Sequence, residues 1–266
     1  MVAPLLSHAR YAWLVTASLI AGGVNAVASG GSFISFPAML GMGIPPVQAN
    51  ATNTVAIWPG QLTSVLTLRD DLPRELLTVS LLCSILGGVG GAVILLHTPQ
   101  SLFVLILPWL LLAATLLFAF SGKISAWLRK ETSYPHAEKP LHVWSLAAMM
   151  LPVCLYIGYF GAGGGLLIMA ALALLGMDDM HKLNSMKVLV ACLSNFSAVV
   201  TFVAARAVVW HYCLIAMVAA GLGGYIGAHY AKRMPAKAIR AMVLTAGFSV
   251  AAWFFWLQIA AKHQGR

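Results

Sequence analysis

Long apolar stretches separated by short polar ones run through almost the whole chain. Ten such segments can be marked, at residues 11–28, 30–44, 47–68, 75–97, 101–120, 143–161, 164–177, 181–205, 210–231 and 238–261. A helix needs about 20 apolar residues to cross the roughly 30 Å hydrocarbon core of a bilayer, and most of the segments have about that length. The pattern therefore predicts an all-α integral membrane protein with about eight to ten transmembrane segments.

Two of the segments, 30–44 and 164–177, are too short to cross the bilayer as helices. Each follows a glycine cluster, which is Gly30-Gly31 in the first case and Gly163-Gly164-Gly165 in the second. Interrupted helices that meet near the bilayer midplane are typical of transporters. We therefore expect a helix break at each cluster.

The first half of the chain matches the second half. A shift of 134 positions places Gly30-Gly31 on Gly164-Gly165, and a shift of 136, after a two-residue insertion, places Gly91-Ala92 on Gly227-Ala228. The shift of 134 also pairs polar residues: Asn50 with Asn184, Asn53 with Lys187, and Gln61 with Asn195. The match predicts two homologous membrane repeats, residues 1–120 and 143–266, joined by a polar linker loop at 121–142.

The number of segments in each half bears on how the repeats are oriented. Five segments per half is an odd number, so the second repeat would be inverted. With both termini outside, ten lysines and arginines lie inside and four outside, in agreement with the positive-inside rule. An alternative plan joins each short segment to the helix before it, which gives four spans per half, parallel repeats and inside termini. That plan also scores ten against four, and we prefer the inverted one because residues 11–44 would make a very long single span.

Composition supports the membrane assignment and excludes several function classes. Apolar residues make up 61% of the chain and charged residues only 9%, against about 25% charged residues in soluble domains. The net charge is +9, but the cations fall mostly in short loops, so nucleic-acid binding is not predicted. The four cysteines stand singly in apolar runs, where we expect buried thiols. No phosphate-binding loop, HExxH motif or His/Cys cluster is present, so we expect neither an enzyme nor a cofactor or metal site.

Polar residues gather on one face of two segments. Positions 50, 54, 57 and 61 share a helical face, as do 184, 187 or 188, 191 and 195. Polar groups inside a span are costly and usually have a purpose. For any one of them, the alternative role is an interhelical hydrogen bond, worth about 0.6 kcal/mol on average. As a set, they predict a polar cavity between the two segments.

Lys187 is the only lysine or arginine well inside a predicted span. All seven acidic residues lie in loops or at segment ends, so no protein carboxylate is placed to neutralise it. A substrate anion would complete the pair, whereas the alternative is that the long stem carries the ammonium to the membrane surface. The glycine clusters could add helix N-termini, which bind anions, although close helix packing is the other interpretation. Gly87, Gly91, Gly223 and Gly227 fit small-residue helix packing better.

The candidate substrate-binding residues are therefore glycines, amides, hydroxyls and one ammonium. They are Gly30, Gly31, Ser32, Asn50, Thr52, Asn53, Thr54, Gln61, Gly164, Gly165, Asn184, Ser185, Lys187 and Asn195.

Motifs stand at residues 22–26, 30–37 and 49–60 in the first half, and at 158–165, 183–187 and Asn195 in the second. Together they resemble the sulfite exporter TauE/SafE family, also called the toluenesulfonate uptake permeases. One departure is Ser29, where many members have glycine. The resemblance implies a multi-pass secondary transporter of the bacterial inner (cytoplasmic) membrane that carries sulfite, thiosulfate or an organosulfonate. Its partners would be the small anion and the lipid bilayer, with a coupling ion (proton or sodium) and a homo-oligomer left open. The alternatives are a passive anion channel and a non-transporting accessory subunit.

Overall fold

The computed structural model describes residues 2–28, 30–68, 72, 74–131, 143–175, 177, 180–230 and 236–264. Within these residues it consists of α-helices joined by short turns and connections. Its ten helices are α1 (Val2–Ala28), α2 (Ser32–Gly41), α3 (Pro46–Leu68), α4 (Arg74–His97), α5 (Gln100–Glu131), α6 (Val143–Tyr159), α7 (Gly164–Leu174), α8 (Met180–Ala204), α9 (Trp210–Tyr230) and α10 (Ala236–Gln264). Each corresponds to one predicted apolar segment, and the short helices α2 and α7 follow the two glycine clusters as expected.

Within the described part of the chain, five stretches are long and apolar enough to cross a membrane. They are Leu76–His97, Gln100–Phe120, Lys182–Ala204, Trp210–Gly227 and Val243–Ala260. The chain is therefore an integral membrane protein. The four cysteines are unbridged and buried, as predicted.

Helix α5 continues further than the sequence suggests. Residues 121–131, assigned above to the polar linker loop, belong to this helix. Their lysine, arginine and glutamate residues are good helix formers, so the polar composition marks the end of the apolar layer and not the end of the helix. The remaining linker residues, 132–142, lie outside the described part of the chain.

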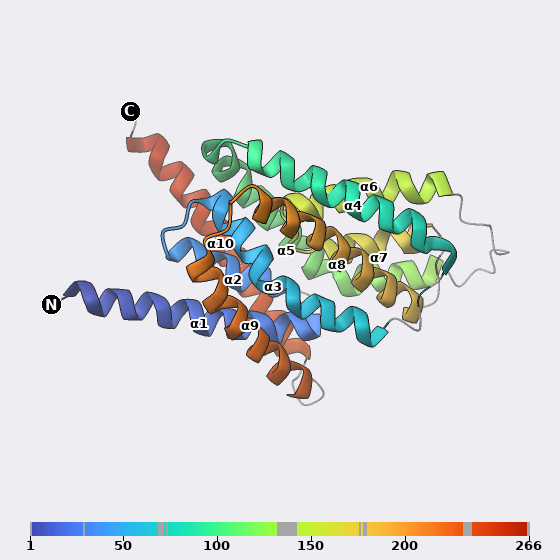
Figure 1. Ribbon diagram of the computed structural model, residues 1–266, viewed down its shortest axis with the longest axis horizontal. Helices are drawn as coiled ribbons and strands as arrows, with labels where there is room; N and C mark the ends of the chain where they lie inside the picture. Colours follow the sequence, from blue (N-terminus) through green and yellow to red (C-terminus); the bar gives the residue numbers. More distant parts are fainter. Residues whose placement is uncertain are drawn as a thin grey trace.

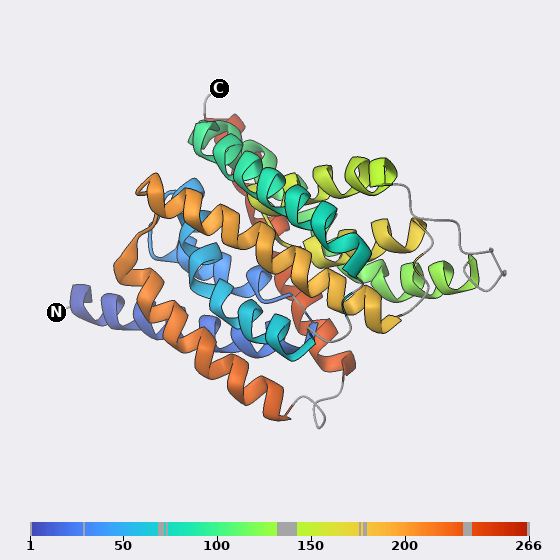
Figure 2. The same ribbon diagram turned by 45° about the vertical axis from the view of Figure 1, so that its right-hand side comes forward.

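The two termini lie toward one end of the helix bundle (Figure 1). The end of α5 and the start of α6 lie toward the other end, and both views show long helices crossing most of the bundle between them (Figures 1 and 2).

Two helix pairs pack with their backbones in contact. Helices α1 and α9 run side by side in the same direction, because Tyr11 contacts His211 near one end and Gly23 lies against Gly227 further along. A Cβ atom on Gly227 would lie 2.5 Å from the Cα of Gly23. Small residues let helix backbones approach this closely, which confirms the packing role predicted for Gly223 and Gly227.

Helices α4 and α6 form the second such pair. The Sγ of Cys83 lies 3.9 Å from the carbonyl oxygen of Ala147, and eight residues further along α4, Gly91 lies against Gly158. These two helices therefore also run in the same direction. A Cβ atom on Gly87 or Gly91 would collide with the α6 backbone or with Cys154, so the predicted packing role of both glycines is confirmed.

Helix α2 folds back along α1. Its N-terminal side, at Gly31, packs on Ala21 and Asn25, whereas its last residue, Gly41, lies near the indole of Trp13. The order of these contacts shows that α2 runs antiparallel to α1. The break at Gly30-Gly31 is thus a reversal of direction.

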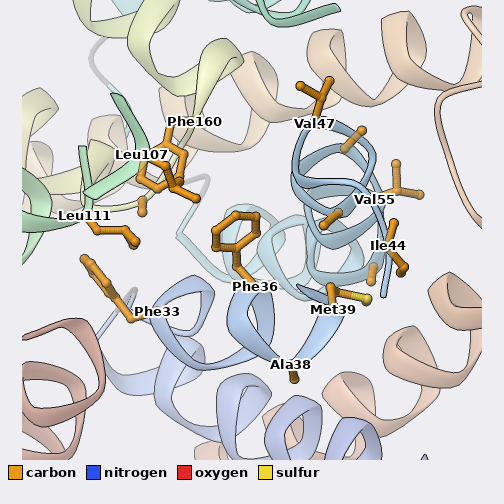
Figure 3. Close-up of a cluster of buried hydrophobic side chains, with 14 of the residues drawn as sticks. Phe33, Phe36, Ala38, Met39, Ile44, Val47, Val55, Leu107, Leu111 and Phe160 are labelled. Carbon is orange, nitrogen blue, oxygen red and sulfur yellow. The ribbon is translucent and has the colours of Figure 1, made fainter. Parts of the chain in front are cut away.

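A buried apolar cluster holds α2 against the second half of the chain (Figure 3). The ring of Phe36 meets that of Phe160 edge to face, with centroids 6.0 Å apart and planes at 87°. Leu107 and Leu111 of α5 are buried in the same cluster. The cluster fixes the start of α2 near the turn that follows α6.

Pro108 interrupts the hydrogen-bond ladder of α5. Proline has no N–H, so the carbonyl four residues earlier, that of Val104, loses its helical donor. The amide nitrogen of Gln258 in α10 donates to the carbonyls of Val104 and Leu105, each at 3.0 Å. Because hydrocarbon cannot supply a donor, the neighbouring helix does.

The glycine contacts predict opposite effects of the same substitution at two positions in α9. Alanine gains about 1 kcal/mol over glycine in helix propensity, but overpacking against a backbone costs about 1–3 kcal/mol. We expect Gly227→Ala to lower the melting temperature of the purified protein in detergent. Gly221→Ala is the matched control, because a Cβ there would meet no described atom within 4 Å. It should leave the melting temperature unchanged or raise it, and equal melting of the two variants would contradict the packing role.

Candidate functional site

A cavity of about 70 Å³ lies where α3 approaches α8. This is several times the about 10–15 Å³ that one water needs. The cavity is lined by seven of the fourteen candidate residues, which are Ser32, Thr54, Gln61, Gly164, Gly165, Lys187 and Asn195. The two polar faces predicted on these helices supply seven of its fifteen lining residues, at positions 54, 57 and 61 of α3 and 187, 188, 191 and 195 of α8.

Among the residues that the structure describes, Lys187 is the only charged side chain that lines the cavity, and no aspartate or glutamate does so. It is half-buried, and no described residue forms a hydrogen bond or ion pair with it. Its stem passes Gly165, where an added Cβ would lie 3.4 Å from the Lys187 Cδ. The glycine therefore leaves room for the lysine to reach the cavity.

Two hydrogen bonds join α3 to α8 beside the cavity. The amide nitrogen of Asn195 donates to the amide oxygen of Gln61 at 3.0 Å, and the indole N–H of Trp58 donates to the carbonyl of Cys192 at 3.1 Å. A primary amide has two N–H donors as well as its oxygen. The bond therefore uses only the oxygen of Gln61, and its amide nitrogen keeps both donors.

The N-termini of both short helices reach the cavity. Ser32 begins α2 and Gly164 begins α7, and both residues line the wall. The N–H groups of Phe33 and Leu166 already donate to the carbonyls of Gly30 and Gly163, at 3.2 and 3.0 Å, so these N-termini contribute mainly the partial positive charge of the helix dipole. The turn before α7 needs glycine, because Gly161 and Gly163 have φ values of 78° and 75°, a region that other residues adopt only with strain. Ammonium, amide N–H groups and helix N-termini together favour a small anion.

Comparison with known proteins agrees with this chemistry. Residues 14–254 match the family described as Sulfite exporter TauE/SafE. The chain belongs to this family. A probable membrane transporter protein, ORF9, of Sinorhizobium sp. is 28% identical over 248 residues, which are 90% of each chain.

Two further relatives of this TauE/SafE chain carry similar names. A probable membrane transporter protein of Haemophilus influenzae is 27% identical over 90% of this chain and 92% of its own. The probable membrane transporter protein YfcA of Escherichia coli K12 is 24% identical over 92% of this chain and 87% of its own. No solved structure matches the chain significantly.

The other seven candidate residues of this TauE/SafE protein lie outside the cavity wall. Two of them tie α3 to other elements. The amide nitrogen of Asn50 donates to the carbonyl of Tyr159 at 3.0 Å, and the hydroxyl oxygen of Thr52 accepts from the N–H of Val209 at 3.0 Å. The remaining five are Gly30, Gly31, Asn53, Asn184 and Ser185, of which all but the half-buried Asn184 are buried.

Eight cavity residues are not among the candidates. They are Asn25, Ile57, Gly60, Ile157, Phe160, Gly161, Val188 and Ala191. Asn25 is a polar residue inside an apolar segment, so its residue type could have marked it. The others are apolar residues or glycines, and only their helical position or a nearby motif relates them to the site.

The geometry predicts that two equivalent asparagines differ in their contribution to stability. Asn50→Leu removes the donor to the Tyr159 carbonyl and should destabilise the protein by roughly 1 kcal/mol. Asn184→Leu should have a smaller effect, because no described residue forms a hydrogen bond with Asn184. Thermal melting of both variants in detergent measures the difference. Equal melting temperatures would show that the bond from Asn50 contributes nothing.

Proposed function

We propose that this protein is a secondary transporter that carries sulfite, thiosulfate or an organosulfonate across the bacterial inner membrane. The observation that supports this best is Lys187, whose ammonium is the one charged group, and is joined by no acidic residue, among the described residues of the cavity wall. A partly buried charge is costly unless it is paired. A sulfur oxyanion supplies that charge together with acceptor oxygens for the Gln61 amide and the N-termini of α2 and α7.

The proposal includes two inverted repeats, a plan that transporters use to place a substrate site at the repeat interface. Helix α1 runs along α9, and α6, which corresponds to α1 in the second half, runs along α4, which corresponds to α9. The two hydrogen bonds between α3 and α8 join residues exactly 134 positions apart. Contacts between equivalent residues are expected beside a two-fold axis, so this axis would pass next to the cavity. The reversal at α2 also favours ten segments over eight.

Replacing the ammonium tests the site directly. Charge-assisted hydrogen bonds contribute about 1.5–3 kcal/mol, so Lys187→Gln should weaken anion binding about ten- to a hundredfold while the protein still folds. The matched control is Lys182→Gln, because Lys182 is on the same helix but exposed and outside the cavity. Isothermal calorimetry with sulfite, thiosulfate and methanesulfonate gives the affinities, and thermal melting checks the fold.

The outcomes separate the candidate functions. Near-normal affinity in Lys187→Gln would mean that the lysine does not bind the anion. Saturable flux that is stimulated by counter-anion in proteoliposomes is expected of a transporter. Flux that does not saturate would identify a passive channel, and a folded protein without flux would indicate an accessory subunit.

The inverted plan predicts which connections share a membrane face. Single cysteines would replace the exposed residues Pro99, Ala205 and Trp144 in a background without native cysteines. A membrane-impermeant thiol reagent applied to cells should either label both 99 and 205 and leave 144 unlabelled, or label 144 and leave both 99 and 205 unlabelled. Opposite labelling of 99 and 205 would favour four parallel spans per half.

A further inference from the structure

The two halves contribute unequally to the cavity. Gly164, Gly165 and Lys187 of the second half line its wall. At a shift of 134 the corresponding residues of the first half are Gly30, Gly31 and Asn53, and all three are buried away from it. Thr54 and Val188, Ile57 and Ala191, and Gln61 and Asn195 are matched pairs within the wall. The unmatched residues of the first half are Asn25, Ser32 and Gly60, so the two halves face the cavity symmetrically only along α3 and α8.

The helix packing shows the same difference. On one side of the site, α8 of the second half lies tightly on α4 of the first, because a Cβ on Gly88 would collide with the Ser194 carbonyl and lie 2.9 Å from the Ser197 Cβ. The corresponding residues on the other side are Gly224 on α9 and Gly60 on α3. A Cβ on Gly224 would meet only the Gly22 carbonyl, at 3.7 Å, and one on Gly60 would meet no described atom within 4 Å. Helix α3 therefore packs on α9 less closely at these positions than α8 packs on α4; Figure 2 shows the course of the four helices.

Two buried polar atoms without hydrogen-bond partners fall at the closed positions. Within the described residues there are four such side-chain atoms, which belong to Ser18, Asn53, Ser80 and Ser194. Asn53 corresponds to Lys187, and Ser194 corresponds to Gly60, so two of the four are counterparts of cavity-lining residues. Buried polar groups normally have a hydrogen-bond partner, and each exception needs an explanation.

We propose that Asn53 and Ser194 line a second vestibule, closed in this structure, through which the same anion reaches the opposite face of the membrane. This inference rests on the proposed function and on the inverted repeats. If the two repeats exchanged conformations, α3 would pack more closely on α9 and α8 would separate from α4. Water could then donate to the Asn53 carbonyl oxygen, and the Ser194 hydroxyl could donate to water or to the anion.

The chemistry of the second vestibule differs from that of the cavity. The amide N–H groups of Asn53 and the hydroxyl of Ser194 can donate to the oxygens of a sulfonate or sulfite. These donors are neutral, whereas Lys187 is charged, and charge-assisted hydrogen bonds are roughly twice as strong. The vestibule on the Asn53 side is therefore the weaker-binding exit from the site.

Cysteine reactivity tests the second vestibule. In a background without native cysteines, Ser194→Cys would be treated with sulfonatoethyl methanethiosulfonate, a small anionic reagent, in proteoliposomes. We expect it to react at least tenfold faster than Ser80→Cys, and to change its rate when methanesulfonate is added. Ser80 is the matched control, because it is equally buried and unpartnered, but its counterpart Ala216 does not line the cavity. Gly60→Cys should react readily and shows that the reagent reaches the site.

The result separates this inference from the proposed function. If Ser194→Cys reacts no faster than Ser80→Cys in protein that still binds sulfite, thiosulfate or methanesulfonate, the second vestibule is refuted and the anion site stands. If Ser194→Cys reacts readily in protein that binds none of these anions, the proposed function fails and the conformational exchange stands.

A second variant provides a test that does not depend on a cysteine at position 194. Asn53→Leu removes the unpartnered amide and should stabilise the closed side, so the melting temperature should rise by a few degrees and transport should slow at least tenfold. A lower melting temperature would show that the Asn53 amide is satisfied in the closed state, which would overturn its assignment to the vestibule.

Discussion

At Gly22, Gly91 and Gly223 the backbones of neighbouring helices touch with no side chain between them. A lipid bilayer provides little hydrophobic drive for helix association, so contact area and polar partners must hold a membrane protein together. The two closest pairs, α1 with α9 and α4 with α6, each join one half of the chain to the other. The halves are therefore interlocked, and α3 and α8 are placed beside each other between these pairs.

The bilayer core also contains no water to bind polar groups, which limits where polar side chains can lie. Asn50 donates to the Tyr159 carbonyl, and Thr52 accepts from the Val209 N–H. Gln258 donates to the carbonyls of Val104 and Leu105, close to Pro108. Each of these groups has a structural partner on another element. Lys187 and Asn53 have none among the described residues. Residues that break the local rules in this way are where function is expected.

The sequence predicts the helices and the cavity-lining faces well, because both depend on local periodicity. Spacing along α3 and α8 identifies positions 54, 57 and 61 and their counterparts, since residues on one helical face share one neighbour. The spacing does not show how far along the helix that neighbour extends. It therefore also predicts Asn50 and Asn184 in the cavity wall, although the cavity ends before them. Nor does the spacing predict that Lys187 lines the cavity while its counterpart Asn53 is buried outside it. Matched sequence positions predict matched environments, and the difference arises only from tertiary packing.

The identity of these two residues bears on which side of the site is closed. Shutting away the Asn53 amide leaves one carbonyl oxygen without a partner, which costs about 1–3 kcal/mol. Burying an unpaired ammonium costs more, because a charge loses its hydration and gains nothing in return. Closure over Lys187 is therefore favourable only when an anion is bound to it, because the pair is then close to neutral. Binding and closure are linked by that difference in free energy, which is the property that a carrier needs and a passive pore does not.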